Sequence, residues 1–200
     1  TGQLSEIGLP LRRNVDRSYR RGLELELSWR AGPRFRLRHA LNVSRNRIRS
    51  WTQFYDVYDA QGNYLGSTSR EHADVAPLLT PELIAHVVGE YTANPWFTID
   101  AGVHHVARSF LDNTNVGNLT TPAYTVVDAG LTIDLSRVKG LGRSKLRIHG
   151  ENLFDRRIFA GGYSYLYDVR QPDGSVTPQG TAYYYPLATR SVFVTLDIRP

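Results

Sequence analysis

Aromatic side chains that could form a binding surface concentrate in two long stretches of the chain, residues 45–80 and 154–189. Ring faces with a polar edge suit flat, amphipathic ligands. Binding residues also concentrate on loops that a rigid scaffold holds in place. An alternative is that these side chains only pack together above the scaffold. We predict seven ligand contacts: Trp51, Tyr55, Tyr58, Tyr163, Tyr165, Tyr167 and Arg170.

Catalytic and metal-binding motifs give no comparable signal. The sequence has no G-x-S-x-G nucleophile elbow and no H-E-x-x-H zinc pair, and residues 140–145 (GLGRSK) lack the spacing of a phosphate loop. His104 and His105 are adjacent, so on a strand they point to opposite faces and cannot share an ion directly. His72, between Glu71 and Asp74, is expected on a solvated loop. We predict no enzyme, no catalytic or metal-site residues, and no cofactor.

Composition narrows the class of protein further. The formal charge of +5 is spread along the 200 residues, which argues against nucleic acid as a partner. Cysteine is absent, so disulfides and Cys-based zinc sites are excluded. No apolar run approaches the roughly 18 residues that a membrane helix needs. Membrane-spanning strands are not excluded, because their apolar residues occupy alternate positions.

Seven segments alternate apolar and polar residues with the period of a β-strand. Leu23, Leu25 and Leu27, for example, share one face while Glu24 and Glu26 share the other. Only Phe193 breaks the alternation of the last segment. The segments span residues 23–29, 35–43, 83–91, 97–103, 127–135, 146–148 and 192–198. The sequence therefore predicts an all-β, antiparallel protein with one apolar and one charged face.

The connections between these segments alternate strictly between short and long. Residues 31–33, 93–95 and about 136–144 form the short ones, and residues 45–80, 107–122 and 154–189 the long ones. Loops this long are unusual inside a compact soluble domain. Outer-membrane barrels, by contrast, have short periplasmic turns and long extracellular loops. The alternation of short and long connections therefore favours a transmembrane β-barrel over the alternative, a soluble β-sandwich that binds carbohydrate.

Charged residues on the polar faces have two interpretations. Cross-strand ion pairs inside the barrel would fix the register, or the charges would form a path for an anionic ligand. We favour the structural role because Arg34 lies near a short, periplasmic turn, far from ligand entry. The residues concerned are Glu24, Glu26, Arg34, Arg36 and Arg38.

Several motifs, in order along nearly the whole chain, resemble the barrel of TonB-dependent outer-membrane receptors. Residues 21–27 (RGLELEL) resemble the family's "RGxExE" strand, and residues 150–155 (GENLFD) resemble its "NLFD" box. Residues 76–96, 110–128 and 185–193 are similar to the hairpin, loop and final approach that the family places there. The resemblance identifies residues 1–200 as the C-terminal fragment of the barrel domain, about seven strands of a plugged barrel of about 22 strands, with the plug domain outside this chain.

The resemblance also implies a function. The parent protein would be a receptor in the bacterial outer membrane that takes up a scarce ligand, such as a ferric siderophore or similar chelate. Its partners would be outer-membrane lipid, the small-molecule ligand, and TonB through an N-terminal region outside this chain. One departure is that this chain ends Ile198-Arg199-Pro200, whereas the family usually ends on an aromatic residue. A passive porin or a structural barrel is the alternative function.

Overall fold

A computed structural model describes residues 14–199 of the chain, and Pro200 lies outside the described part. None of the described residues belongs to a helix long and apolar enough to cross a membrane. The strands are β1 (Ser18–Ala31), β2 (Phe35–Asp59), β3 (Tyr64–Val75), β4 (Leu83–Asn94), β5 (Phe97–Val106), β6 (Ser109–Phe110), β7 (Thr120–Thr121), β8 (Tyr124–Asp134), β9 (Lys145–Glu151), β10 (Phe159–Arg170), β11 (Val176–Pro186) and β12 (Ser191–Asp197).

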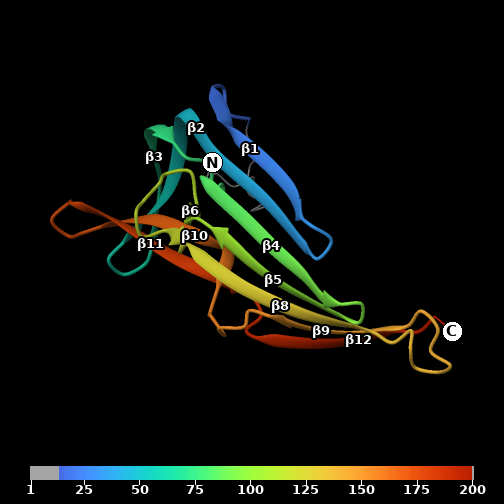
Figure 1. Ribbon diagram of the computed structural model, residues 1–200. Coiled ribbons are helices and arrows are strands. Elements are labelled where there is room, and N and C mark those ends of the chain that lie inside the picture. The colour runs from blue at the N-terminus through green and yellow to red at the C-terminus, as the bar shows by residue number, and fades with distance from the viewer. Residues whose placement is uncertain (1–13, 200) are drawn as a thin grey trace.

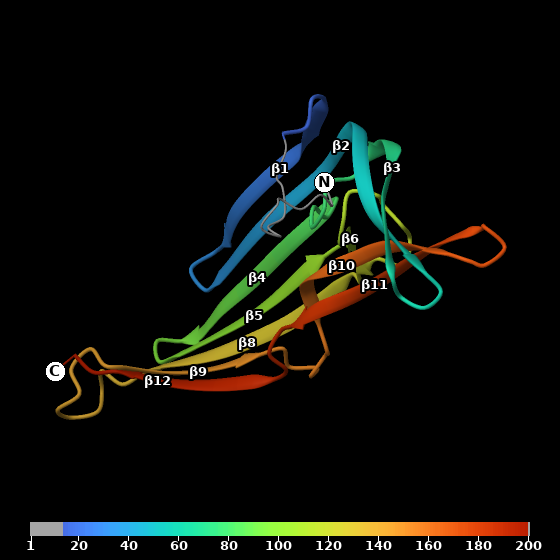
Figure 2. The ribbon, with the colours of Figure 1, turned by 180° about the vertical axis from the view of Figure 1, so that it is seen from behind.

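Seven of these strands form one continuous, tilted and twisted wall, seen from both sides in Figures 1 and 2. Their order is β1-β2-β4-β5-β8-β9-β12, and every neighbouring pair is antiparallel. These are the seven strands that the alternation predicts. Short turns join β1 to β2 and β4 to β5 at the same end of the wall. Gly32 takes a φ of 72° in the first turn, a conformation that favours glycine.

The two faces of the wall have opposite chemistry. Leu23, Leu25 and Leu27 are 61%, 46% and 50% exposed, and Val192 and Val194 at the other edge are 64% and 66% exposed. An exposed apolar surface that extends from β1 to β12 marks contact with an apolar environment. The wall therefore has the outward face of a membrane barrel.

Buried apolar side chains gather at the long-loop end and not along the wall. Among the described residues they include Ile48, Val57 and Val75 of β2 and β3, together with Leu111 and Leu119 near β6 and β7. A soluble sandwich would instead bury the apolar face of the wall under a second sheet. No second sheet covers that face in the described part of the chain.

The long connections contain more strand than the sequence analysis predicts. β2 is 25 residues long in total, ends at Asp59 and forms a hairpin with β3. β10 and β11 form a second hairpin. The alternation breaks at Phe193 because this residue faces the polar side, opposite His149. Because β1 pairs with β2 only up to Ile48, the edge of β2 beyond it is open, and residues 167–170 of β10 pair there in parallel with residues 56–59.

Candidate functional site

The three long connections converge at one end of the wall and hold one another in place. The β10–β11 hairpin leaves the wall between β9 and β12 and crosses to the upper part of β2 (Figures 1 and 2). The small β6–β7 sheet lies beside β10. Segments separated by about a hundred residues in sequence therefore form one assembly above the barrel wall.

An ion pair with a fully buried carboxylate joins β3 and β10 in this assembly. Asp168 of β10 is completely buried, and its Oδ2 accepts a hydrogen bond of 2.5 Å from Nη2 of Arg70 on β3. The hydrogen bond and charge of Asp168 raise the pKa of the Arg70 guanidinium. The other carboxylate oxygen, Oδ1, is buried without a hydrogen-bond partner among the described residues. Such a pair stabilises the assembly only while both members remain, because a lone buried charge is costly.

Two aromatic rings complete this centre. The Arg70 guanidinium carbon lies 4.5 Å from the centroid of the Tyr55 ring, and the Tyr55 hydroxyl shares a 2.9 Å hydrogen bond with Nε2 of His72. Burial raises the pKa of Tyr55 and lowers the pKa of His72, so both groups are neutral near pH 7. The centre therefore carries one cation and one anion, with two neutral rings around them.

Asp112 connects the middle loop to the same assembly. Its Oδ2 accepts a 2.7 Å hydrogen bond from Oγ of Ser164 on β10, while its Oδ1 accepts hydrogen bonds from the backbone N and the Oγ1 of Thr114. Asn115 in turn exchanges hydrogen bonds of 2.6 and 2.9 Å with the backbone of Ala76. Each of the three connections is thus tied to at least one other by polar contacts. We call the three joined connections, residues 45–80, 107–122 and 154–189, the clasp.

An aromatic pocket opens between β2 and β10 of this assembly. Its volume is about 370 Å³, and Tyr58, Tyr165 and Tyr167 line it together with Asp59, Ala60, Gly62 and Val169. The Tyr58 ring packs edge-on against Tyr167 at 5.9 Å and against Tyr64 at 5.8 Å. Aromatic faces and hydroxyls held in this way can bind a flat ligand that carries both apolar and polar groups.

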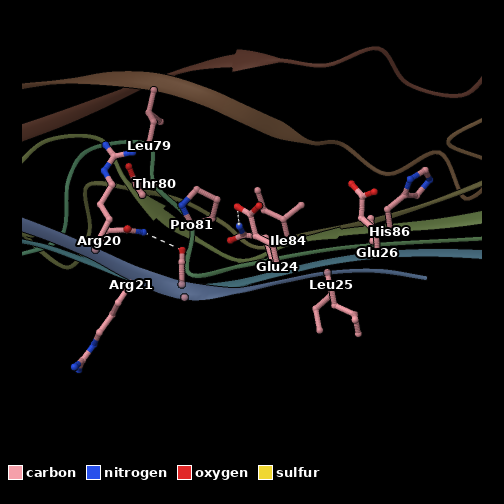
Figure 3. A pocket seen from close by; sticks show the side chains of 16 residues that line it. Arg20, Arg21, Glu24, Leu25, Glu26, Leu79, Thr80, Pro81, Ile84 and His86 are labelled. Atoms are coloured by element: carbon pink, nitrogen blue, oxygen red, sulfur yellow. Dashed lines mark hydrogen bonds between the residues drawn. The ribbon is translucent and has the colours of Figure 1, made fainter. Parts of the chain in front are cut away.

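A second hollow, of about 690 Å³, lies on the polar face of the wall and is shown in Figure 3. Arg20, Glu24, Glu26 and His86 point into it, below the loop of residues 79–81 that overhangs β1 and β2. Nδ2 of Asn42 donates a 2.9 Å hydrogen bond to Glu24 across the strands. The hollow belongs to the lumen side of the wall and mixes charges of both signs.

The charges of the polar face form cross-strand pairs at several positions. Arg36 lies 3.7 Å from Glu90, and Arg147 lies 3.4 Å from Asp100. Arg36 is one of the five charged residues for which the sequence analysis favours a structural role, and its pair with Glu90 agrees with that role. His104 packs against His86 and Tyr124, whereas the neighbouring His105 bonds Thr125 through Nδ1. Among residues 14–199, no group of three or more His, Cys, Asp or Glu side chains could hold a metal ion.

The structure brings together some of the predicted ligand contacts and separates others. Tyr58, Tyr165 and Tyr167 share the aromatic pocket, and Arg170 ends β10 beside it, opposite Asp59. Tyr163 stacks on Tyr183 further along the hairpin, with ring centroids 5.0 Å apart. Trp51 lies apart on β2, where its Nε1 bonds Gln53. Tyr55 is only 5% exposed, and its contacts are with Arg70 and His72.

Sequence reasoning missed Arg70, Asp112 and Asp168, which hold the assembly together. A signal for Asp168 was present, because Tyr163, Tyr165 and Tyr167 alternate with Ser164, Leu166 and Asp168. That alternation identifies a strand whose second face carries a carboxylate. Its partner could not be found in this way, since Arg70 is 98 residues distant.

Comparison with known proteins decides the family. A family profile described as "TonB dependent receptor-like, beta-barrel" matches residues 3–153. The chain belongs to this family. Members of the TonB-dependent receptor family are transport receptors and not enzymes, and their barrels are outer-membrane proteins. No curated protein sequence matches the chain.

Solved structures agree with the barrel fold of a TonB-dependent receptor. The siderophore receptor PiuA from Acinetobacter baumannii is 17% identical, with a TM-score of 0.64 over 90% of this chain and 22% of PiuA. The ferric yersiniabactin uptake receptor FyuA from Yersinia pestis is 18% identical, with a TM-score of 0.55 over 90% of this chain and 23% of FyuA. The chain therefore spans less than a quarter of the length of these two proteins.

Proposed function

We propose that this chain is the C-terminal part of the barrel of an outer-membrane receptor that imports a ferric siderophore or a similar metal chelate, with energy supplied through TonB. Membership of the TonB-dependent receptor family carries the proposal. Further support comes from two similar structures, one of a siderophore receptor and one of a ferric yersiniabactin uptake receptor. Coupling to TonB and the plug would both involve regions outside these 200 residues.

The aromatic pocket is the proposed first contact for the chelate. Siderophore complexes present flat rings or extended apolar faces together with charged oxygen atoms, so stacking on Tyr58, Tyr165 and Tyr167 suits them. Arg170 beside the pocket would attract an anionic complex. Tyr163 and Trp51 would extend the contact surface along β10 and β2. Tyr55 would act from below by holding Arg70 in place.

The test is ligand binding to the full-length protein in outer-membrane vesicles. Ferric complexes of a catecholate, a hydroxamate and a phenolate siderophore would be titrated into the vesicles. Binding would be followed by the quenching of tryptophan fluorescence. We expect saturable quenching by at least one complex, and a loss of affinity of about three- to tenfold for each of Tyr58→Ala and Tyr167→Ala. Tyr91→Ala, at an exposed tyrosine near the short turns, is the matched control and should bind normally. Absence of saturable binding for all three complexes would contradict the proposal.

A further inference from the structure

The outward face of β1 and β2 changes from apolar to basic at one level. The residue pairs that lie opposite each other on this face, starting from the short turn, are Trp29–Leu37, Leu27–His39, Leu25–Leu41, Leu23–Val43, Arg21–Arg45 and Tyr19–Arg47. Arg49 follows Arg47 on the same face, one step further along β2. The apolar residues end at Leu23 and Val43, and arginine replaces them on both strands.

Two observations place these arginines on the outward face and not in the lumen. Figure 3 shows Arg21 and Leu25 pointing away from the hollow into which Arg20, Glu24 and Glu26 point. On β2, Asn46 and Ile48 alternate with Arg45 and Arg49 and are buried at 6% and 5% exposure. The side chains of Arg45 and Arg49, in contrast, are 53% and 58% exposed.

The distance along the strand places this change at the membrane boundary. From the short turn at Ala31 to Leu23 are eight residue steps, which at about 3.3 Å each and a tilt of about 40° rise roughly 20 Å. The apolar band of outer-membrane barrels is about 25 Å tall. A guanidinium group that faces lipid is strongly unfavourable at the midplane but is tolerated near the interface. Arg21 and Arg45 therefore lie at the headgroup level on the long-loop side.

The basic group is only partly neutralised by the protein itself. Arg49 bonds Asp74 at 3.0 Å, Arg45 lies 3.9 Å from the same carboxylate, and Arg47 bonds Glu82 at 2.8 Å. Arg21 faces Arg45 directly, and like charges in this position are destabilising. Within the described part of the chain, its only charged or aromatic contact is with the Tyr19 ring, 5.4 Å from its guanidinium carbon; Arg49 lies over the same ring at 4.7 Å.

We propose that Arg21, Arg45 and Arg49, together with Tyr19, bind the phosphate groups of an anionic lipid in the outer leaflet. The inference rests on the outer-membrane location in the proposed function. Guanidinium groups bind phosphate oxygens through paired hydrogen bonds, and a phosphate between Arg21 and Arg45 would remove their mutual repulsion. The lipid's acyl chains would lie against Leu23, Leu25 and Val43 directly below, so one molecule satisfies both halves of the surface. Tyr19 has the amphipathic ring that favours this depth.

Lipid retention by the full-length protein tests the proposal. The protein would be reconstituted in vesicles of phosphatidylcholine, with or without diphosphoryl lipid A, and the bound lipid A measured by native mass spectrometry after extraction. We expect the wild type to retain lipid A specifically. In the double variant Arg21→Gln/Arg45→Gln, the affinity for lipid A should be lower by about fivefold for each arginine removed. Arg38→Gln, on the lumen face of the same strand, is the matched control and should retain lipid A normally.

Thermal unfolding in the same vesicles gives a second readout. Without lipid A, the double variant should be at least as stable as the wild type, because the like-charged pair is gone. With lipid A, the wild type should gain stability and the variant should not. Equal retention by wild type and double variant, or equal retention of lipid A stripped of its phosphates, would overturn the lipid site while the receptor function stands. Recovery of wild-type protein in the aqueous fraction would overturn the membrane location, and with it both proposals.

Discussion

At the scale of single residues, the Arg70–Asp168 pair carries an asymmetry that mutation can reveal. Asp168 is completely buried, whereas the Arg70 side chain is 38% exposed. Removing Arg70 leaves a buried carboxylate without its counter-charge, but removing the charge of Asp168 leaves a guanidinium that water can reach. The two halves of the same contact are therefore not equivalent.

We expect Arg70→Ala to destabilise the clasp between β3 and β10 by about 3 kcal/mol or more, and Asp168→Asn to cost clearly less. Hydrogen exchange of the backbone amides of residues 159–170 measures the opening of the hairpin. Arg36→Ala is the control: it breaks a half-exposed pair with Glu90 and should cost at most about 1 kcal/mol. Equal effects of Arg70→Ala and Arg36→Ala would show that the Arg70–Asp168 pair does not hold β10 against β3.

His72 makes the same clasp sensitive to pH. Burial lowers its pKa below the ordinary value near 6.5, so the folded loops bind this proton more weakly than the unfolded segment does. The stability that the neutral ring contributes is fully present above the ordinary pKa, and it is lost as the pH falls from there through the lowered pKa of the folded state. After correction for the intrinsic pH dependence of amide exchange, the protection factors of the β3 amides should therefore fall from pH 7 to pH 5.5, and His72→Gln should flatten this dependence. An unchanged pH profile in the variant would assign the sensitivity to another group.

At the scale of elements, Gly22 permits the close approach of β1 to β2. A Cβ at this position would lie 2.5 Å from the Val43 carbonyl oxygen and 2.9 Å from the Ser44 Cα, so backbone would have to move. We expect Gly22→Ala to destabilise the assembled barrel by about 1–3 kcal/mol, measured by chemical unfolding in detergent. Gly89→Ala on β4 is the control, because its nearest new contact is the Phe35 ring at an ordinary 3.7 Å. A similar cost for both substitutions would contradict this account.

The wall was predictable from sequence because one rule governs it. Alternation from Leu23 to Trp29 or from Phe35 to Val43 reports directly which face meets lipid, and adjacent strands joined by short turns must pair. The clasp was not predictable in the same way. The pairing of Asp168 with Arg70, and of β10 with the open edge of β2, depends on how loops far apart in sequence fold over the wall.

The ligand contacts were predicted by residue type, and the structure separates them by position. The tyrosines of β10 share a pocket with Tyr58 because the hairpin reaches β2. Tyr55, three residues from Tyr58, is buried beneath Arg70. Composition alone could not distinguish an exposed tyrosine from a buried one in the same stretch.

At the scale of the whole molecule, the chain is one section of a larger barrel wall. Its apolar face requires lipid, its open edges at β1 and β12 require further strands, and lipid cannot satisfy an unpaired strand edge. A protein with this wall, clasped loops at one end and short turns at the other has the form of an outer-membrane receptor. In the proposed function, the clasped loops bind the chelate before it enters the lumen.

The most direct test of this account is the accumulation of radioactive iron by iron-starved cells that carry the full-length protein as their only ferric-chelate receptor. The account predicts saturable uptake of at least one of the three ferric siderophore complexes, abolished when TonB is deleted and reduced by Tyr58→Ala/Tyr167→Ala. Uptake that rises linearly with concentration and continues without TonB would instead identify a passive porin, and would contradict the proposed function.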